Sequence, residues 1–180
     1  MPEELVVRHC APTLAGLKTA SLFTVISDSE EKLRQDVAEL NDKLNGHRIR
    51  ALVLGHIRNR VRIYLYRPDR LSEDLHDDLA LRILCERGYD PDDLNQCLDT
   101  LMQKLEDNDQ FPHEIGLFLG YPPGDVQGFI ENLKPCKFVG AWKVYTDERT
   151  ARKTFERFQK CRDIYEKQVS NSIPLQRLAV

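Results

Sequence analysis

The spacing of the apolar residues changes from a helical to an alternating period in the first third of the chain. The helical period is carried by four residues: Leu33, Val37, Leu40 and Leu44. It predicts a helix that Gly46 ends. The segments RIRALVLGHI and RVRIYLYRP then alternate in polarity, which predicts a hairpin over about residues 48–66 that turns near Arg58 and Asn59. A chain with both periods must pack helices on a sheet.

Helical spacing returns further along the chain. It predicts helices over residues 11–24, 71–83, 94–105 and 147–168, and two short helices around a turn within residues 111–132. The segment CKFVGAWKVY predicts one more strand, over about residues 136–145. The predicted fold class is therefore α+β, with a small, largely antiparallel sheet packed with about six helices. Without a linker or an internal repeat, residues 1–180 are predicted to form a single globular domain.

The net charge, the lack of long apolar runs and the cysteine pattern argue against several functional classes of protein. The net charge of −3 gives the chain no overall attraction for nucleic acid or anionic lipid. No apolar run is long enough to cross a membrane, and the N-terminus lacks the basic start of a signal peptide. The five cysteines are odd in number and never spaced C-x-x-C, which argues against a disulfide framework or a zinc ribbon. These features predict a cytoplasmic protein with free thiols.

The stretch FPHEIGLFLGYPPGDVQGFIEN, residues 111–132, has the spacing of a DNA-reading helix-turn-helix. Gly116, Gly120 and Val126 stand at the small, turn and apolar positions of that motif. The second helix has no Lys or Arg to meet a phosphate or a guanine, and it carries Asp125 instead. DNA binding is therefore the least favoured hypothesis, and no duplex DNA partner is expected. The stretch is interpreted as a compact helical corner.

Cys10 is the leading candidate for a reactive group. It lies between His9 and a helix predicted to begin near Pro12, and both a helix N-terminus and a protonated histidine lower the pKa of a thiol. Lys18, on the same predicted helix, is a candidate to hold an anionic ligand. The alternative interpretation is that Cys10 is a small buried hydrophobic residue and His9 an ordinary surface residue.

His113 and Glu114 form the second candidate group. His113 can act as the base that activates Cys10, and Glu114 or a backbone carbonyl can orient its ring. In the alternative interpretation, Glu114 is a favourable charge in a first helical turn and His113 is a cap. Because thiolate and imidazole also bind borderline metals, a site made of Cys10, His113 and Cys136 is a further option, with the metal unknown.

Aromatic and basic residues are interleaved on the predicted strands. The aromatic residues are Tyr64, Tyr66, Trp142 and Tyr145, and the basic ones are Arg60, Arg62, Arg67 and Lys143. Such a face can stack a planar ligand, for example a flavin, a nucleotide or single-stranded RNA. The same alternation is also typical of the solvated face of an antiparallel sheet. Tyr121, in the GLFLGYPP segment, is a further candidate for ligand binding.

Three stretches together resemble a known bacterial family: RHCAPTLAGLKTASLF at residues 8–23, the stretch at residues 111–132, and WKVYTD at residues 142–147. The family is a domain-of-unknown-function family found mainly in anaerobes, and the resemblance covers nearly the whole chain. It implies no activity, but neighbouring flavodoxin and iron-handling genes suggest a redox or iron-handling partner. Relatives often carry a second cysteine five residues after the position of Cys136. Ala141 stands there in this chain and weakens a metal site built on that pair.

These observations predict a cytoplasmic protein that binds a small molecule or a metal or iron-linked group at a Cys/His site, with a redox association as one option. The candidate catalytic residues are Cys10, His113 and Glu114, and the candidate ligand-binding residues are His9, Lys18, Tyr121, Trp142, Lys143 and Tyr145. The RHC, FPHE and WKVY segments are expected to meet at one cleft, and no cofactor is identified. Two alternatives stay open: an enzyme that depends on Cys10 with His113 as its base, and a protein that docks a flavodoxin-like or iron-handling partner.

Overall fold

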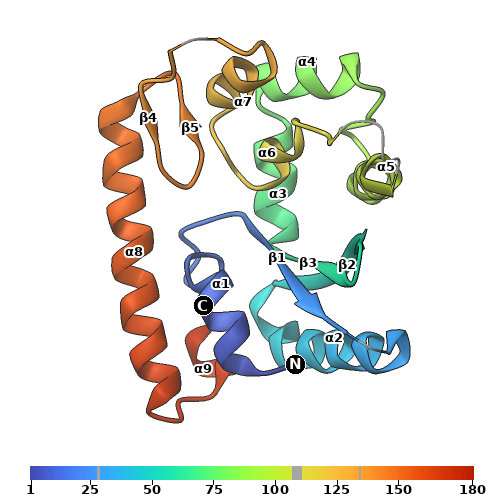
Figure 1. The fold of residues 1–180 in the computed structure, drawn as a ribbon, viewed down its shortest axis with the longest axis vertical. Coiled ribbons are helices and arrows are strands. Elements are labelled where there is room, and N and C mark those ends of the chain that lie inside the picture. Colours follow the sequence, from blue (N-terminus) through green and yellow to red (C-terminus); the bar gives the residue numbers. More distant parts are fainter. Residues whose placement is uncertain (28, 107–110, 134) are drawn as a thin grey trace. The chain divides into compact units, whose positions relative to one another are not determined.

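The computed structural model of the chain describes residues 1–27, 29–106, 111–133 and 135–180. In these residues it has a three-stranded antiparallel sheet, a separate two-stranded hairpin and nine α-helices (Figure 1). The predicted α+β class is confirmed. The chain divides into two compact units, the first made of residues 1–69 and 160–180 and the second of residues 70–159. The prediction of a single domain stays a prediction.

The first unit is built on the three-stranded sheet. Its elements are α1 (Glu3–Leu14), β1 (Ala20–Ile26), α2 (Glu30–Leu44), the 3-10 helix η1 (Asn45–His47), β2 (Arg50–Ile57), β3 (Arg60–Tyr66), the later part of α8 (Glu148–Ser170) and α9 (Leu175–Leu178). The strand order is β1–β3–β2, and the middle strand pairs antiparallel with both neighbours, so that Tyr66 lies opposite Ala20 on one side and Arg50 on the other. The predicted hairpin, with its turn at Arg58 and Asn59, is confirmed.

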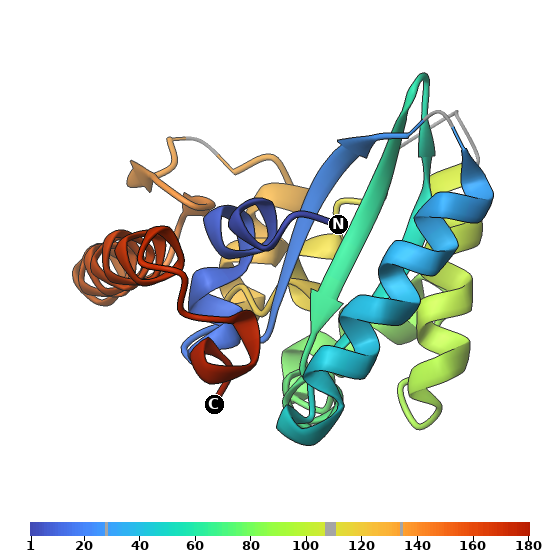
Figure 2. The same ribbon diagram turned by 90° about the horizontal axis from the view of Figure 1, so that it is seen from below.

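One face of this sheet carries the core of the first unit. Helices α1 and α2 lie against the same face, as Figures 1 and 2 show from two directions. The four residues that predicted α2 from their spacing, Leu33, Val37, Leu40 and Leu44, are all buried in this core. Alternate residues of β3 (Val61, Ile63 and Leu65) meet them from the sheet.

Residues 11–24 do not form the predicted helix. Pro12 lies inside α1, which ends at Leu14, and Gly16 takes a φ of 67° just after it. The N–H of Leu17 then donates to the carbonyl of Pro12, which completes the helix end. The following residues enter β1, whose backbone groups pair with β3. This strand was missed because its partner lies about forty residues later in the sequence, where local spacing carries no signal.

The second unit is mostly helical. Its elements are most of α3 (Pro68–Leu75), α4 (Asp78–Glu86), α5 (Leu94–Glu106), α6 (Ile115–Phe118), α7 (Pro123–Ile130), β4 (Phe138–Val139), β5 (Lys143–Val144) and the first part of α8. The single helix predicted over residues 71–83 is in fact two helices. The break occurs because the Asp77 carboxylate accepts hydrogen bonds from the N–H groups of Leu79 and Ala80 and caps α4.

The strand predicted over residues 136–145 is also corrected. Two short strands, β4 and β5, pair with each other as a separate hairpin and do not join the three-stranded sheet. The chain turns between them at Gly140, whose N–H donates to the carbonyl of Trp142. A hairpin that closes on itself satisfies its backbone groups locally, so it needs no place in the larger sheet.

Helices α6 and α7 form the predicted helical corner around Gly120, which has a φ of 70°. Two glycines allow this corner to pack closely. A Cβ atom on Gly116 would lie 2.8 Å from a methyl group of Val126, and one on Gly128 would lie 2.6 Å from the ring of Tyr145. Glycine at these positions therefore brings α7 against both α6 and the segment that follows β5.

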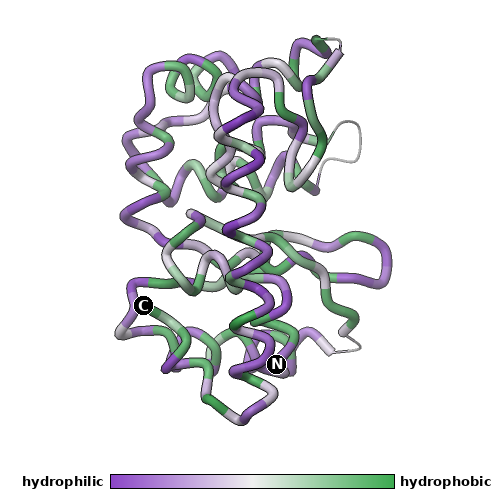
Figure 3. Tube along the Cα trace, turned by 90° about the vertical axis from the view of Figure 1, so that its left-hand side faces the viewer, coloured by the Kyte–Doolittle hydropathy of each residue, from purple (hydrophilic) through white to green (hydrophobic). Residues whose placement is uncertain are grey.

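Helix α8 runs from Glu148 to Ser170, and the helix predicted over residues 147–168 is confirmed. Figure 3 shows it as a largely hydrophilic helix at the front of the view. Its buried residues are few: Ala151, Phe158 and Cys161. Within the described ranges, no helix combines the length and the apolar content that a bilayer crossing requires.

Candidate functional site

A cavity of about 240 Å³ in the second unit brings the FPHE and WKVY segments together. Four of the predicted site residues line it: His113, Tyr121, Trp142 and Lys143. The remaining lining residues are Phe111, Ile115, Gly116, Asp125, Val126 and Phe129. We refer to this cavity as the aromatic cavity. Its lining comes from the segment before α6, from α6 and α7, and from the β4–β5 hairpin.

Aromatic rings form two walls of the aromatic cavity. On one wall the rings of Tyr121 and Trp142 are stacked, with centroids 4.9 Å apart and planes inclined by 30°. On the other wall the ring of His113 meets Phe129 edge-on, with centroids 4.8 Å apart. The ammonium group of Lys143 lies 5.0 Å from the centroid of the same Phe129 ring, within cation–π distance. The two basic groups of the cavity therefore both contact one phenyl ring.

Asp125, in the first turn of α7, fixes the hairpin segment that supplies Trp142. The indole N–H of Trp142 donates to Oδ2 of this buried carboxylate at 2.8 Å. The backbone N–H groups of Tyr145 and Thr146 and the Thr146 hydroxyl all donate to Oδ1, each also at 2.8 Å. Oδ1 thus accepts three hydrogen bonds and Oδ2 accepts one, so both oxygens of the carboxylate are engaged inside the protein. Asp125 thus holds Trp142 in the cavity wall together with the ring contacts that Trp142 makes with Tyr121 and Phe155.

Two predicted site residues lie beside the aromatic cavity without lining it. Tyr145 packs against Gly128 and is bound through its backbone to Asp125. Glu114 is buried, accepts a hydrogen bond from the Tyr89 hydroxyl at 3.0 Å, and lies 3.5 Å from Nε of Arg87. Burial, together with the negative charge of Glu114, raises the pKa of Tyr89. These contacts anchor Glu114 to the segment before α5.

Cys10 lies in the first unit, in a different setting from the one predicted. It is inside α1 and not before a helix start, and its side chain is completely buried. Burial raises the pKa of the Cys10 thiol to about 12. The predicted exposed thiol with a lowered pKa is therefore contradicted, because the helix begins seven residues earlier, at Glu3, and its N-terminus does not face the sulfur. The catalytic role proposed for Cys10 and His113 stays a prediction.

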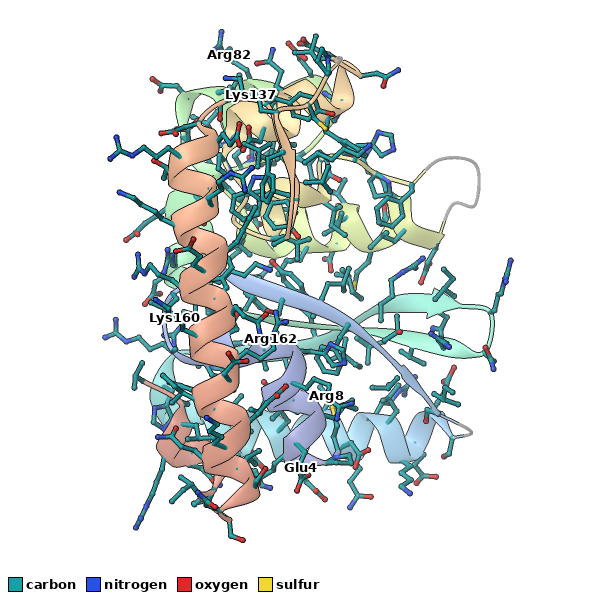
Figure 4. The ribbon with its side chains drawn as sticks, turned by 60° about the vertical axis from the view of Figure 1, so that its left-hand side comes forward. Glu4, Arg8, Arg82, Lys137, Lys160 and Arg162 are labelled. Carbon is teal, nitrogen blue, oxygen red and sulfur yellow. The ribbon has the colours of Figure 1, made fainter. Side chains whose placement is uncertain are left out.

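His9 and Lys18 belong to the first unit as well. Burial, together with the neighbouring charge of Arg162, lowers the pKa of Lys18 to about 8. The ring of His9 stacks on Phe23 with centroids 5.2 Å apart. Burial, Arg8 on α1 and Arg162 on α8 together lower the pKa of His9; the two arginines are labelled in Figure 4. The prediction that these residues join the FPHE and WKVY segments at one cleft stays a prediction.

The other proposed sites gain no geometric support. Among the residues that the structure describes, no group of three or more His, Cys, Asp or Glu side chains is arranged to hold a metal ion. Tyr64 and Tyr66 stack on each other, but both are buried, as is Arg62. The predicted exposed face of tyrosines and arginines on this strand is therefore wrong, because β3 is the central strand and is covered on both faces.

Comparison with known protein families assigns the chain to one of them. Residues 6–179 match the family described as protein of unknown function, DUF3793. The chain belongs to DUF3793. This match confirms two parts of the resemblance noted in the sequence: the family is one of unknown function, and it covers most of the chain. No curated protein and no solved structure matched the chain.

Sequence reasoning on this DUF3793 chain did not identify six of the residues that line the aromatic cavity, among them Asp125, Phe129 and Phe111. Asp125 was assigned to an exposed acidic helix face, yet it is buried and holds Trp142. Neither Phe111 nor Phe129 was named as a candidate for ligand binding, although both line the cavity. The available signal was the concentration of aromatic residues in the 111–132 and 142–147 segments, which is higher than in the rest of the chain.

The five cysteines of this DUF3793 chain should differ in their reaction with iodoacetamide. We expect Cys85 to label first at about pH 8, because it is exposed whereas Cys10, Cys97 and Cys161 are buried. Burial raises the pKa of Cys97 to about 11 and that of Cys10 to about 12, so both stay protonated. Mass spectrometry of peptides after timed labelling measures the rates, and labelling in urea is the control. Fast labelling of native Cys10 would restore the thiolate hypothesis.

Proposed function

We propose that this protein binds a small planar molecule in the aromatic cavity. The observation that carries the proposal is the convergence of four aromatic residues on one cavity: Phe111, Tyr121, Phe129 and Trp142. Cavities lined by aromatic and aliphatic side chains, with a few placed polar groups, are the usual form of small-molecule sites. Here the polar groups are His113 and Lys143, which both contact Phe129.

The size of the aromatic cavity supports a ligand of one or two rings. Its volume of about 240 Å³ lies just below the range of about 300–1,000 Å³ typical of cavities that enclose drug-sized ligands. A complete flavin nucleotide or dinucleotide would extend far outside it. The flat walls provided by Tyr121, Trp142 and Phe129 favour a planar body, since aromatic rings contact one another best face to face with an offset or edge to face.

The walls of the aromatic cavity are held by contacts inside the protein. Asp125 fixes Trp142, and the edge contact of His113 with Phe129 restricts both rings. A side chain that is already ordered loses little conformational freedom when a ligand binds, so less of the binding free energy is spent on ordering it. This arrangement supports binding by a largely pre-formed site.

The remaining functional predictions are kept as proposals. All five cysteines are free in the structure, which supports the cytoplasm as the compartment of action. A metal or iron-linked ligand, the Cys10-dependent reaction and the docking of a flavodoxin-like partner gain no specific observation from the fold. The small-molecule proposal is therefore the one that the geometry supports best.

The proposal can be tested with a neutral planar probe, 2-naphthalenemethanol. The chain has a single tryptophan, so the indole N–H of Trp142 gives one cross-peak in a proton–nitrogen correlation spectrum. We expect this cross-peak to shift and saturate as the probe is added, since Trp142 lines the cavity. Phe129→Ala should weaken binding about tenfold, because it removes one wall and its ring contact.

The control for this titration is Tyr165→Ala. Tyr165 is also half-buried and aromatic, but it packs against the core of the first unit and does not line the aromatic cavity. Its removal should leave the affinity for the probe within about twofold. If the Trp142 cross-peak does not respond to saturating probe, or if both variants weaken binding equally, the cavity is not the binding site.

A further inference from the structure

We infer that the natural ligand of the aromatic cavity is an aromatic carboxylate, with its rings between the walls and its negative charge at Lys143. This inference rests on the proposed function and specifies its ligand class. It starts from the distribution of charged groups around the cavity. Three of the lining residues have a side chain that can carry a charge at neutral pH: the carboxylate of Asp125, the imidazole of His113 and the ammonium group of Lys143.

Asp125 is a poor partner for a charged ligand. Its carboxylate is buried and already accepts four hydrogen bonds, from Trp142, Tyr145 and Thr146. A cationic ligand would have to compete with these four donors for the carboxylate, and the ammonium group of Lys143, which lines the same cavity, would repel it. The electrostatics of the cavity thus disfavour an amine or a guanidine as the ligand.

Lys143 is suited to bind an anion. Its side chain is exposed, and its ammonium group lies over the face of Phe129; within the part of the chain that the structure describes, no carboxylate pairs with it. A cation–π contact at an exposed site is worth only about 0.5–1 kcal/mol, so an ion pair with a ligand carboxylate can replace it at little cost. His113 contacts the same ring from another direction and adds a second hydrogen-bonding group next to that position.

The side chains inside the aromatic cavity determine the polarity of the part of the ligand that they enclose. Ile115, Gly116 and Val126 line it together with the rings and offer no side-chain hydrogen bond, so the enclosed part must be apolar. The polar groups of Lys143 and His113 lie on one wall, beside Phe129, so the ligand carries its polar group at one end. One ammonium group matches the single charge of a carboxylate better than the double charge of a phosphate monoester.

A matched pair of probes tests this inference. 2-Naphthoate and 2-naphthalenemethanol share their rings and differ in charge. We expect the unmodified protein to bind 2-naphthoate at least about tenfold more tightly than the alcohol, as a charge-assisted hydrogen bond predicts. Lys143→Met should lower the naphthoate affinity about tenfold, and it should lower the affinity for the uncharged alcohol by a clearly smaller factor. The shift of the Trp142 indole cross-peak is the readout for all titrations.

The control variant is Lys153→Met, which removes an exposed lysine of α8 that does not line the aromatic cavity. It should leave both affinities unchanged, and added salt should weaken naphthoate binding in the protein that keeps Lys143. Equal affinity for the two probes, or equal effects of the two lysine variants, overturns the carboxylate inference while the small-molecule proposal stands. Failure of both probes to bind overturns the two together.

Discussion

Asp125→Ala is expected to destabilise the protein by about 3–5 kcal/mol, the largest effect of any single substitution proposed for this chain. The substitution leaves the indole of Trp142, two backbone N–H groups and the Thr146 hydroxyl without their acceptor. Each buried donor that loses its partner costs about 1–3 kcal/mol, less where water can replace the carboxylate. Urea unfolding followed by circular dichroism measures the change in the free energy of unfolding.

Two further variants make the Asp125 test specific. Asp125→Asn keeps an oxygen for the three donors at Oδ1, but its amide N–H₂ faces the indole N–H of Trp142. It should cost less stability than Asp125→Ala while still displacing the Trp142 cross-peak and weakening probe binding. Asp99→Ala removes an exposed carboxylate of α5 and should change stability by no more than about 0.5 kcal/mol. If Asp125→Ala behaves like Asp99→Ala, the carboxylate does not hold the hairpin.

Gly128→Ala is expected to cost about 1–3 kcal/mol through overpacking. The added Cβ would lie 2.6 Å from Cγ of Tyr145 and 2.9 Å from its Cβ, so the ring cannot simply rotate away. The backbone of Gly128 does not have a positive φ, and the effect is therefore steric rather than conformational. The same unfolding experiment measures it, and the Trp142 cross-peak should shift because Tyr145 and Trp142 share Asp125.

Gly46→Ala is the matched control for this substitution. A Cβ on Gly46 meets nothing within 4 Å, so alanine there should be neutral or stabilising by up to about 1 kcal/mol. A Gly128→Ala protein that is as stable as the unmodified one would show that α7 can move away from Tyr145. In that case the close approach at Gly128 would not determine the position of the hairpin.

The spacing of apolar residues was sufficient to predict those helices and strands in which buried residues recur at a regular interval. The leucines of α2 and α5, the alternation in β2 and β3, and the long apolar stripe of α8 each recur over several turns or residues, and those elements formed as expected. Spacing failed at residues 20–26, where a strand depends on β3 for its pairing. It also failed at residues 136–145, where a tight turn at Gly140 divides one expected strand into two.

At the candidate site, too, the sequence was informative about single residues but not about contacts between residues that lie far apart in the chain. His113, Tyr121 and Trp142 could be named from the sequence because their residue types are infrequent in this chain, and Lys143 because it stands next to Trp142. The role of Asp125 could not, since its partners lie 17–21 residues later and an acid in a first helical turn already has a local explanation. For Cys10, the misplaced helix start led directly to the wrong pKa direction.

The discontinuous make-up of the first unit has a consequence for the order in which the chain folds. The core of that unit includes Cys161, Leu175 and Leu178, which are synthesised after the whole of residues 70–159. The second unit is continuous in sequence and includes no residue after Gln159. Bringing the two parts of the first unit together across residues 70–159 carries an entropic free-energy cost that grows as about 1.5 RT ln n, where n is the number of residues in between, and this cost falls once that segment has become compact. The aromatic cavity, whose lining lies within the second unit, can therefore form before the first unit has all of its core.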